Sequence, residues 1–115
     1  MRAVFRELPS FARFREQYLD DAAYRSMQNA LMRQPAAGDV IAGTGGLRKL
    51  RWIDPTRQKG KRSGLRVIYF WKSDDNQFWL FSIYDKDEAK DLSAEQRKML
   101  RQRLQLELKA RGIDT

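Results

Sequence analysis

Residues 65–84 read LRVIYFWKSDDNQFWLFSIY, two apolar runs separated by a short polar segment. The runs 65–71 and 78–84 are rich in aromatic and β-branched residues, which favours β-strands. The polar segment 72–76 consists of residues typical of tight turns, so the two runs are predicted to form an antiparallel hairpin. Because both runs are apolar on both faces, we expect central strands in a sheet that is covered on each side.

Two helices are predicted on the N-terminal side of this hairpin. The first opens at Pro9-Ser10, and the second is capped by Asp20 or Asp21 and stops before Pro35. Each has one apolar face at helical spacing. The predicted face residues are Phe11, Phe14 and Tyr18 in the first helix and Tyr24, Met27, Leu31 and Met32 in the second.

The remaining segments complete the predicted element order. Residues 3–8 and 47–53 are expected to be strands, and the glycine-rich residues 38–46 a connection without a helix period. A last helix is predicted from Ser93 to Arg111, because Ser93 and Gln96 have capping-box spacing and Gly112 follows as a C-cap. Its apolar seam consists of Leu100, Leu104 and Leu108. The order is therefore β-α-α-β-β-β-α, an α+β fold with a helical hairpin on one face of the sheet and the last helix on the other.

Composition limits the classes of function. The chain of 115 residues, 42% of them hydrophobic, suits a single domain spanning residues 1–115. The sequence contains no cysteine and no histidine, so disulfides, thiolate zinc sites and the commonest general base are excluded. Any catalysis must use Lys, Arg, Tyr or carboxylates, and we expect no metal or cofactor. Apolar runs are too short for a membrane span or a leader, so a cytoplasmic protein without a membrane partner is expected.

Positive charge is concentrated in residues 46–71, where eight Lys or Arg residues accompany a single acid, Asp54. With a net charge of +8, the chain is expected to bind nucleic acid or another phosphate-rich partner. Antiparallel pairing would place Arg66 beside Ile83 and Tyr84, at the same end of the sheet as the basic loop. The other members of this predicted cationic rim are Arg51, Arg57, Lys59, Lys61, Arg62, Lys86 and Lys90.

Such a rim is suited to a phosphodiester. Arg66, on a central strand, can meet two phosphate oxygens and stabilise charge that develops on phosphorus. Tyr84 is a candidate for proton transfer or for stacking on a base. Two structural alternatives remain: Arg66 extends to solvent or pairs with Asp85 or Asp87, and Tyr84 is an ordinary strand-end aromatic. The segment AGTGG, residues 42–46, is not a phosphate loop, since no GK[ST] follows it.

Three segments carry a resemblance to a known family. GTGGLRKLRW (43–52), GKRSGLRVIYFW (60–71) and IYDKDEAKDLSAEQ (83–96) resemble the RelE/HigB toxins of bacterial type II toxin–antitoxin pairs, and the HigB branch most. The resemblance implies a twisted, mainly antiparallel sheet and a ribosome-dependent endoribonuclease. The enzyme would cut messenger RNA by attack of a 2′-hydroxyl on the adjacent phosphate, without a metal. The implied partners are the 70S ribosome, messenger RNA and a cognate antitoxin, usually a small helix-turn-helix protein through which the pair binds operator DNA.

The resemblance also implies roles for individual residues. Arg66 would stabilise the transition state, with Lys86 and either Lys59 or Lys61 as further cations. A tyrosine that other members carry near the start of the last helix has no counterpart in residues 85–96, so Tyr84 or Lys86 is the candidate for proton transfer. The predicted RNA-binding residues are Arg48, Lys49, Arg51, Arg57, Lys59, Arg62 and Lys90.

Two other functions are compatible with these features. The same fold includes ParE-type toxins, which poison DNA gyrase and would cause DNA breaks instead of truncated messages. The basic rim alone would also support an RNA- or DNA-binding module without catalysis. Because both nucleic-acid functions would depend on salt, only analysis of the products separates them.

Overall fold

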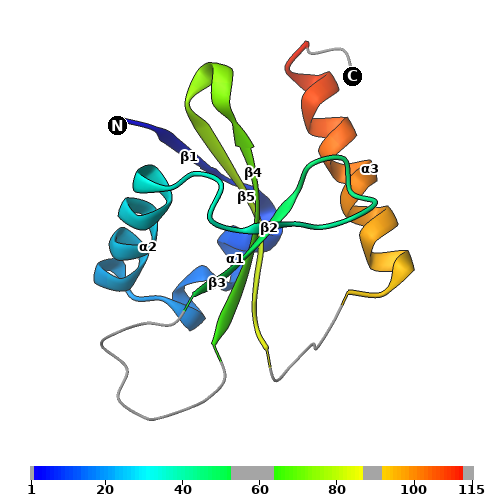
Figure 1. Cartoon of the computed structure of the whole chain (residues 1–115). Helices are drawn as coiled ribbons and strands as arrows, with labels where there is room; N and C mark the ends of the chain where they lie inside the picture. Colours follow the sequence, from blue (N-terminus) through cyan, green and yellow to red (C-terminus); the bar gives the residue numbers. More distant parts are fainter. Residues whose placement is uncertain (1, 53–63, 87–91, 113–115) are drawn as a thin grey trace.

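The computed structural model describes residues 2–52, 64–86 and 92–112, and it shows one sheet between two helical layers (Figure 1). The strands are β1 (Val4–Glu7), β2 (Asp39–Val40), β3 (Arg48–Trp52), β4 (Leu65–Lys72) and β5 (Gln77–Asp85), in the sheet order β1-β5-β4-β3-β2. All neighbours are antiparallel except β1 and β5, which are parallel. The α+β fold class is therefore confirmed, and β4 and β5 are central strands as predicted.

The three helices have the predicted starting signals. They are α1 (Pro9–Tyr18), α2 (Asp21–Arg33) and α3 (Ala94–Ala110). The Asp20 carboxylate accepts a hydrogen bond from Ala23 N at 2.8 Å and caps α2. Ser93 and Gln96 form the full capping box of α3, with distances of 2.9 and 3.1 Å. The last helix ends one residue earlier than predicted, and Gly112 follows with φ +75°.

Helices lie on both faces of the sheet (Figure 1), and each face has its own hydrophobic core. Successive strand residues point to opposite faces, so the apolar runs 65–71 and 78–84 supply both cores. The core on the side of the helical hairpin α1–α2, called the hairpin-side core, includes Phe11, Met27, Leu31, Val67 and Leu80. The core on the side of α3, called the α3-side core, includes Leu47, Ile68, Trp79, Leu104 and Leu108. The predicted covering by a helical hairpin and by a later helix is confirmed.

Phe14 is an exception to the predicted apolar face of α1. Its side chain is 37% exposed, and the Arg13 guanidinium lies 5.2 Å from the centre of its ring. The helical spacing placed it near Phe11, but α1 presents only Phe11 fully to the core. The cation covers one side of the exposed ring, which is the usual accommodation for a surface aromatic.

The prediction for residues 38–46 was incomplete, because they contain the short strand β2. Asp39 pairs with Lys49 and Val40 with Arg48. A strand of two exposed residues has no readable period, so its existence depends on the long-range pairing with β3. Gly38 lies just before β2 and its backbone is very close to Tyr69, since a Cβ at this position would lie 2.8 Å from the Tyr69 ring.

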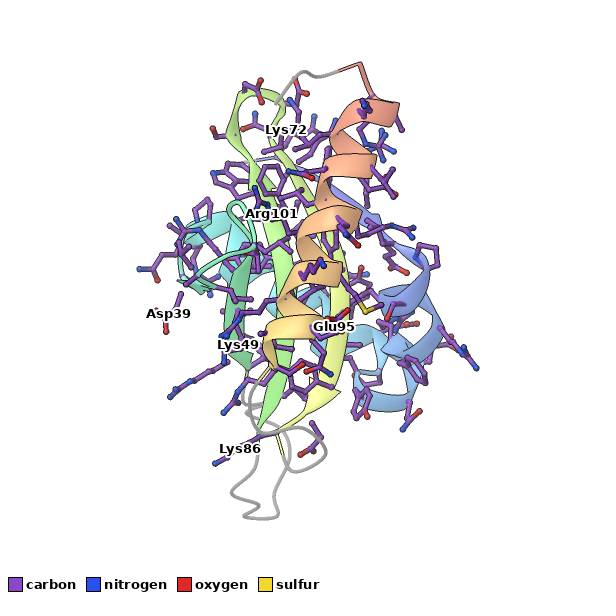
Figure 2. All side chains as sticks on the ribbon, turned by 90° about the vertical axis from the view of Figure 1, so that its right-hand side faces the viewer. Asp39, Lys49, Lys72, Lys86, Glu95 and Arg101 are labelled. Carbon is purple, nitrogen blue, oxygen red and sulfur yellow. The ribbon has the colours of Figure 1, made fainter. Side chains whose placement is uncertain are left out.

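The connection between β4 and β5 is the predicted tight turn. It contains a short 3-10 segment, η1 (Ser73–Asp75), and Asn76 in the left-handed conformation with φ 52°. Lys72 is buried at the end of β4 and pairs with Asp74 and Asp75, each at 2.7 Å. These contacts close the hairpin at the end of the sheet opposite to the cationic rim (Figure 2).

A β-bulge in β5 changes which of its residues point to each face of the sheet. Ile68 pairs with Ser82 and Tyr69 pairs with Leu80, so Phe81 is an extra residue in β5. Phe81 packs in the α3-side core, and Ile83 returns to the hairpin-side core. The bulge therefore directs Tyr84 to the α3 side, where strict alternation from Phe81 would have placed Ile83.

None of the helices among the described residues is long and apolar enough to cross a membrane.

Candidate nucleic-acid interface

Arg51, Arg66 and Tyr84 form one row across β3, β4 and β5. Arg51 is the register partner of Arg66, and Arg66 is the partner of Tyr84. Residues directly opposite each other in an antiparallel sheet share a face. Tyr84 packs against the α3-side core, so all three residues belong to that face. The structure thus brings together three residues that the sequence predicted for the rim.

Two further predicted cations lie near this row. Lys49 is half-buried and begins the adjacent row, Lys49–Ile68–Ser82, on the same face. Lys86 follows β5 directly and is exposed, and its backbone N donates to Gly64 O at 3.1 Å. Figure 2 shows Lys86 at the lower end of the sheet, with Lys49 above it and the first turn of α3 at about the height of Lys49. The structure therefore brings four predicted cations to this part of the sheet, which are Lys49, Arg51, Arg66 and Lys86.

These cations have no matching acids in the described part of the chain. Across residues 2–52, 64–86 and 92–112, no carboxylate lies within ion-pair distance of Lys49, Arg51 or Arg66. Arg66 is half-buried, and its Nη1 donates to Leu65 O at 3.3 Å. Like charges that are directly opposite destabilise a sheet, so the Arg51–Arg66 pair favours a bound anion.

The sequence offers Arg66 two alternative ion-pair partners, Asp85 and Asp87. Asp85 is the register partner of Leu65, whose side chain belongs to the hairpin-side core, so Asp85 is directed to the other face of the sheet. An Arg66–Asp85 ion pair is therefore not formed. Asp87, the second possible partner, lies outside the described residues.

Arg48, also predicted to bind RNA, is not brought to this face. It pairs with Tyr69 on the hairpin side of the sheet. Its Nη1 donates to Gly38 O at 2.8 Å and to Ala36 O at 3.4 Å. The Tyr69 hydroxyl donates to Pro35 O at 2.7 Å and accepts from Gly38 N at 2.9 Å. Arg48 and Tyr69 thus hold the connection that leads into β2.

A pocket of about 310 Å³ adjoins the cationic row, between the sheet and the first turns of α3. Ile68, Ser82 and Tyr84 line it from the sheet, and Leu92, Gln96, Met99 and Leu100 line it from α3 and the residues before that helix. The sequence did not predict this pocket. One available signal was Ser82, a single small polar residue inside the apolar run 78–84.

Five of the predicted site residues lie outside the described part of the chain. Their roles stay predictions; these residues are Arg57, Lys59, Lys61, Arg62 and Lys90. Among the residues that the structure does describe, no group of three or more acidic side chains is arranged to hold a metal ion.

The structure defines the class of the chain as a small α+β domain in which three antiparallel strands present a cationic row beside a single covering helix. No family model matches the sequence. Among solved structures, the chain is similar to the Escherichia coli toxin RelE, in the free state of a variant with two arginines replaced by alanine. The similarity has a TM-score of 0.50 at 12% identity and covers 78% of this chain and 90% of the RelE chain. The chain therefore has a RelE-like fold, and assignment to the HigB branch stays a prediction.

Proposed function

We propose that this protein is the toxin of a type II toxin–antitoxin pair and acts as a ribosome-dependent endoribonuclease on messenger RNA. The observation that carries the proposal is the row Arg51–Arg66–Tyr84 on a RelE-like fold. A row of two guanidinium groups and a phenol offers charge for a phosphodiester and an aromatic or proton-transfer group beside it.

The proposed reaction is an internal transfer at phosphorus. The RNA 2′-oxygen attacks the adjacent phosphate and forms the O2′–P bond, while the bond from phosphorus to the 5′-oxygen of the next nucleotide breaks. The products are a 2′,3′-cyclic phosphate and a 5′-hydroxyl. One group removes the 2′-hydroxyl proton and another protonates the leaving 5′-oxygen, so protons balance without a metal.

Arg66 is the proposed stabiliser of the transition state. It is half-buried on a central strand, so its position is better defined than that of a surface side chain. Its donors can meet two non-bridging oxygens as negative charge develops on them. Arg51, on the neighbouring strand, would share the same phosphate, and Tyr84 or Lys86 would transfer protons.

The remaining basic residues would hold RNA by its backbone. Lys49 is the described member of this group, and contacts of this kind fix position without reading sequence. We also propose Lys61 as a further catalytic cation. The other proposed backbone-binding residues are Arg57, Lys59, Arg62 and Lys90.

The proposed partners follow from the activity. They are the 70S ribosome, messenger RNA and a cognate antitoxin, with operator DNA bound only through the antitoxin complex. These partners would place the protein in the cytoplasm.

The test is to map RNA ends after brief induction in bacteria and to repeat the cleavage with purified ribosomes. The parent should truncate messages, and Arg66→Ala should lose most of the cleavage and of the growth arrest. Arg25→Ala is the matched control, since Arg25 is exposed on α2. If Arg66→Ala arrested growth as strongly as the parent, the assignment of Arg66 would be wrong.

The same experiment separates the competing functions. DNA breaks with intact messages would indicate a ParE-type inhibitor of gyrase. RNA or ribosome binding without any new RNA ends would indicate a binding module without catalysis.

A further inference from the structure

Tyr84 belongs both to the cationic row and to the pocket beneath α3. It is the register partner of Arg66, and its side chain also lines the pocket of about 310 Å³. Ile68, on the pocket floor, is two residues beyond Arg66 on the same face of β4. This spacing along a strand is about 7 Å, so the cation and the apolar floor are close enough for two parts of one ligand.

The pocket itself is mostly apolar. Ile68, Leu92 and Leu100 supply its aliphatic surface, and Tyr84 supplies an aromatic one. Pockets of this size with apolar walls and a few polar groups are typical of small-molecule and cofactor sites. A planar, largely apolar group therefore fits its chemistry better than a charged group.

Two polar side chains can orient such a group. Ser82, at the bulge in β5, lines the pocket from the sheet and offers a hydroxyl that both donates and accepts. Gln96 lines it from α3, and its Oε1 already accepts from Ser93 N at 2.9 Å. The amide NH₂ of Gln96 is therefore the part that remains available as a donor toward a ligand.

Two cations stand beside the pocket on the sheet. Lys49 on β3 is the register partner of Ile68, and Arg66 on β4 is the register partner of Tyr84. A matching ligand must be anionic at one end and flat and apolar at the other. A nucleotide combines these properties, and proteins that bind single-stranded RNA hold splayed bases against aromatic side chains.

We propose that this pocket receives one base of the RNA strand whose phosphate is bound by Arg51 and Arg66. The proposal rests on the proposed function and adds a base subsite to it. Tyr84 would contact the base or the adjoining sugar, and Ser82 and Gln96 would contact the edge of the base. The pocket would then set which nucleotide stands beside the phosphate that is cut.

The experiment measures binding separately from cleavage. Dinucleoside monophosphates with a 2′-deoxy first sugar, which cannot be cut, are titrated into the protein while the Ile68, Leu92 and Leu100 methyl signals are followed by NMR. A probe of the same backbone without one base is the comparison. Base-containing probes should shift these methyl signals and bind about tenfold more tightly than the base-free probe.

Two variants test the pocket at different positions. Ser82→Leu should fill the floor and weaken the base-containing probes by about tenfold, while leaving the base-free probe unchanged. Gln96→Glu keeps a capping-box acceptor for Ser93 N and removes the amide donor, so it should also weaken those probes without unfolding α3. Gln102→Glu, with the same charge change at an exposed position on α3, is the matched control and should bind as the parent does.

The outcomes distinguish this proposal from the proposed function. Equal binding of base-containing and base-free probes, or unchanged binding by Ser82→Leu, would overturn the base subsite even if ribosome-dependent cleavage were found. Base-dependent shifts without any RNA cleavage would support the subsite and reject the enzyme. Pocket shifts caused by a partner protein and by none of the nucleotide probes would assign the pocket to protein docking and overturn the proposal.

Discussion

Arg51 and Arg66 are direct cross-strand partners on β3 and β4, and no carboxylate in the described part of the chain lies within ion-pair distance of either. Opposite positions in an antiparallel pair usually favour complementary charges. As like charges at opposite positions, the two arginines are expected to repel each other, and an anionic ligand bound by both would remove that repulsion.

Reversing one charge of this pair should stabilise the free protein. Arg51→Glu should raise the free energy of unfolding by roughly 0.5 to 1 kcal/mol, because repulsion is replaced by attraction. Urea denaturation at low salt checks this value. RNA affinity should fall at the same time, since the phosphate loses a cation.

A control separates the local effect from net charge. Arg25→Glu makes the same charge change on an exposed face of α2 and should leave RNA affinity nearly unchanged. The stability gain of Arg51→Glu should shrink in high salt, which screens exposed charges. A gain of equal size in both variants would contradict a specific Arg51–Arg66 repulsion.

Inorganic phosphate should stabilise the protein through Arg66. At about ten times the dissociation constant, a ligand that binds only the folded state adds about 1.4 kcal/mol. Thermal unfolding in phosphate, compared with chloride at equal ionic strength, measures this gain. Arg66→Gln should lose most of it. A gain of unchanged size in Arg66→Gln would place the anion elsewhere.

Tyr84→Phe tests proton transfer at the row. The ring is retained, so packing against the α3-side core and RNA affinity should change little. If Tyr84 transfers a proton, the single-turnover cleavage rate on ribosomes should fall by about 10² or more. If Lys86→Met shows that loss and Tyr84→Phe does not, the proton-transfer role belongs to Lys86.

The helical hairpin should give the protein a stability limit at high pH. The Tyr24 hydroxyl donates to Glu7 Oε2 at 2.6 Å, and burial, with the Glu7 carboxylate, raises the pKa of Tyr24 above its usual range. The folded state therefore keeps a proton that the unfolded chain loses near pH 10. The stabilising contribution of this group is complete below pH 10 and is lost as the pH rises through the higher folded pKa.

Unfolding free energies between pH 9 and 11 measure this effect. The slope from one tyrosine should approach about −1.4 kcal/mol per pH unit. Tyr24→Phe should be less stable at neutral pH by about 1 kcal/mol, through loss of the hydrogen bond, and should show a shallower fall at high pH. Burial raises the pKa of Tyr69 as well, so part of the slope should remain. Equal slopes in both proteins would contradict the assignment to Tyr24.

The central hairpin could be predicted because its signals are local. Each run in residues 65–84 has strong strand propensity, and the turn residues between them are typical. The caps of α2 and α3 were equally readable, since Asp20 and Ser93 act within a few residues. In contrast, β2 exists only through its pairing with β3, a distant contact that two residues cannot signal.

The site could be predicted only as a region. Arg48 and Arg51 look alike in sequence, but they lie on opposite faces because their positions in β3 differ by an odd number. The predicted strand pairing placed Arg66 near Ile83 and Tyr84 alike. The bulge in β5, which the sequence does not signal, makes Tyr84 the direct partner of Arg66. The pocket depends on how α3 lies over the sheet, which is a tertiary relationship without a local sequence signal.

The extra residue in β5 also affects how relatives should be compared with this chain. A relative with a regular β5 would carry the residue equivalent to Tyr84 one position closer to its hairpin turn, because Phe81 has no partner of its own in β4. A gap-free sequence alignment would then match that aromatic with Ile83 and report it as missing. Equivalent residues at this end of the sheet are better assigned by their strand partner, and the partner to look for is the arginine at position 66.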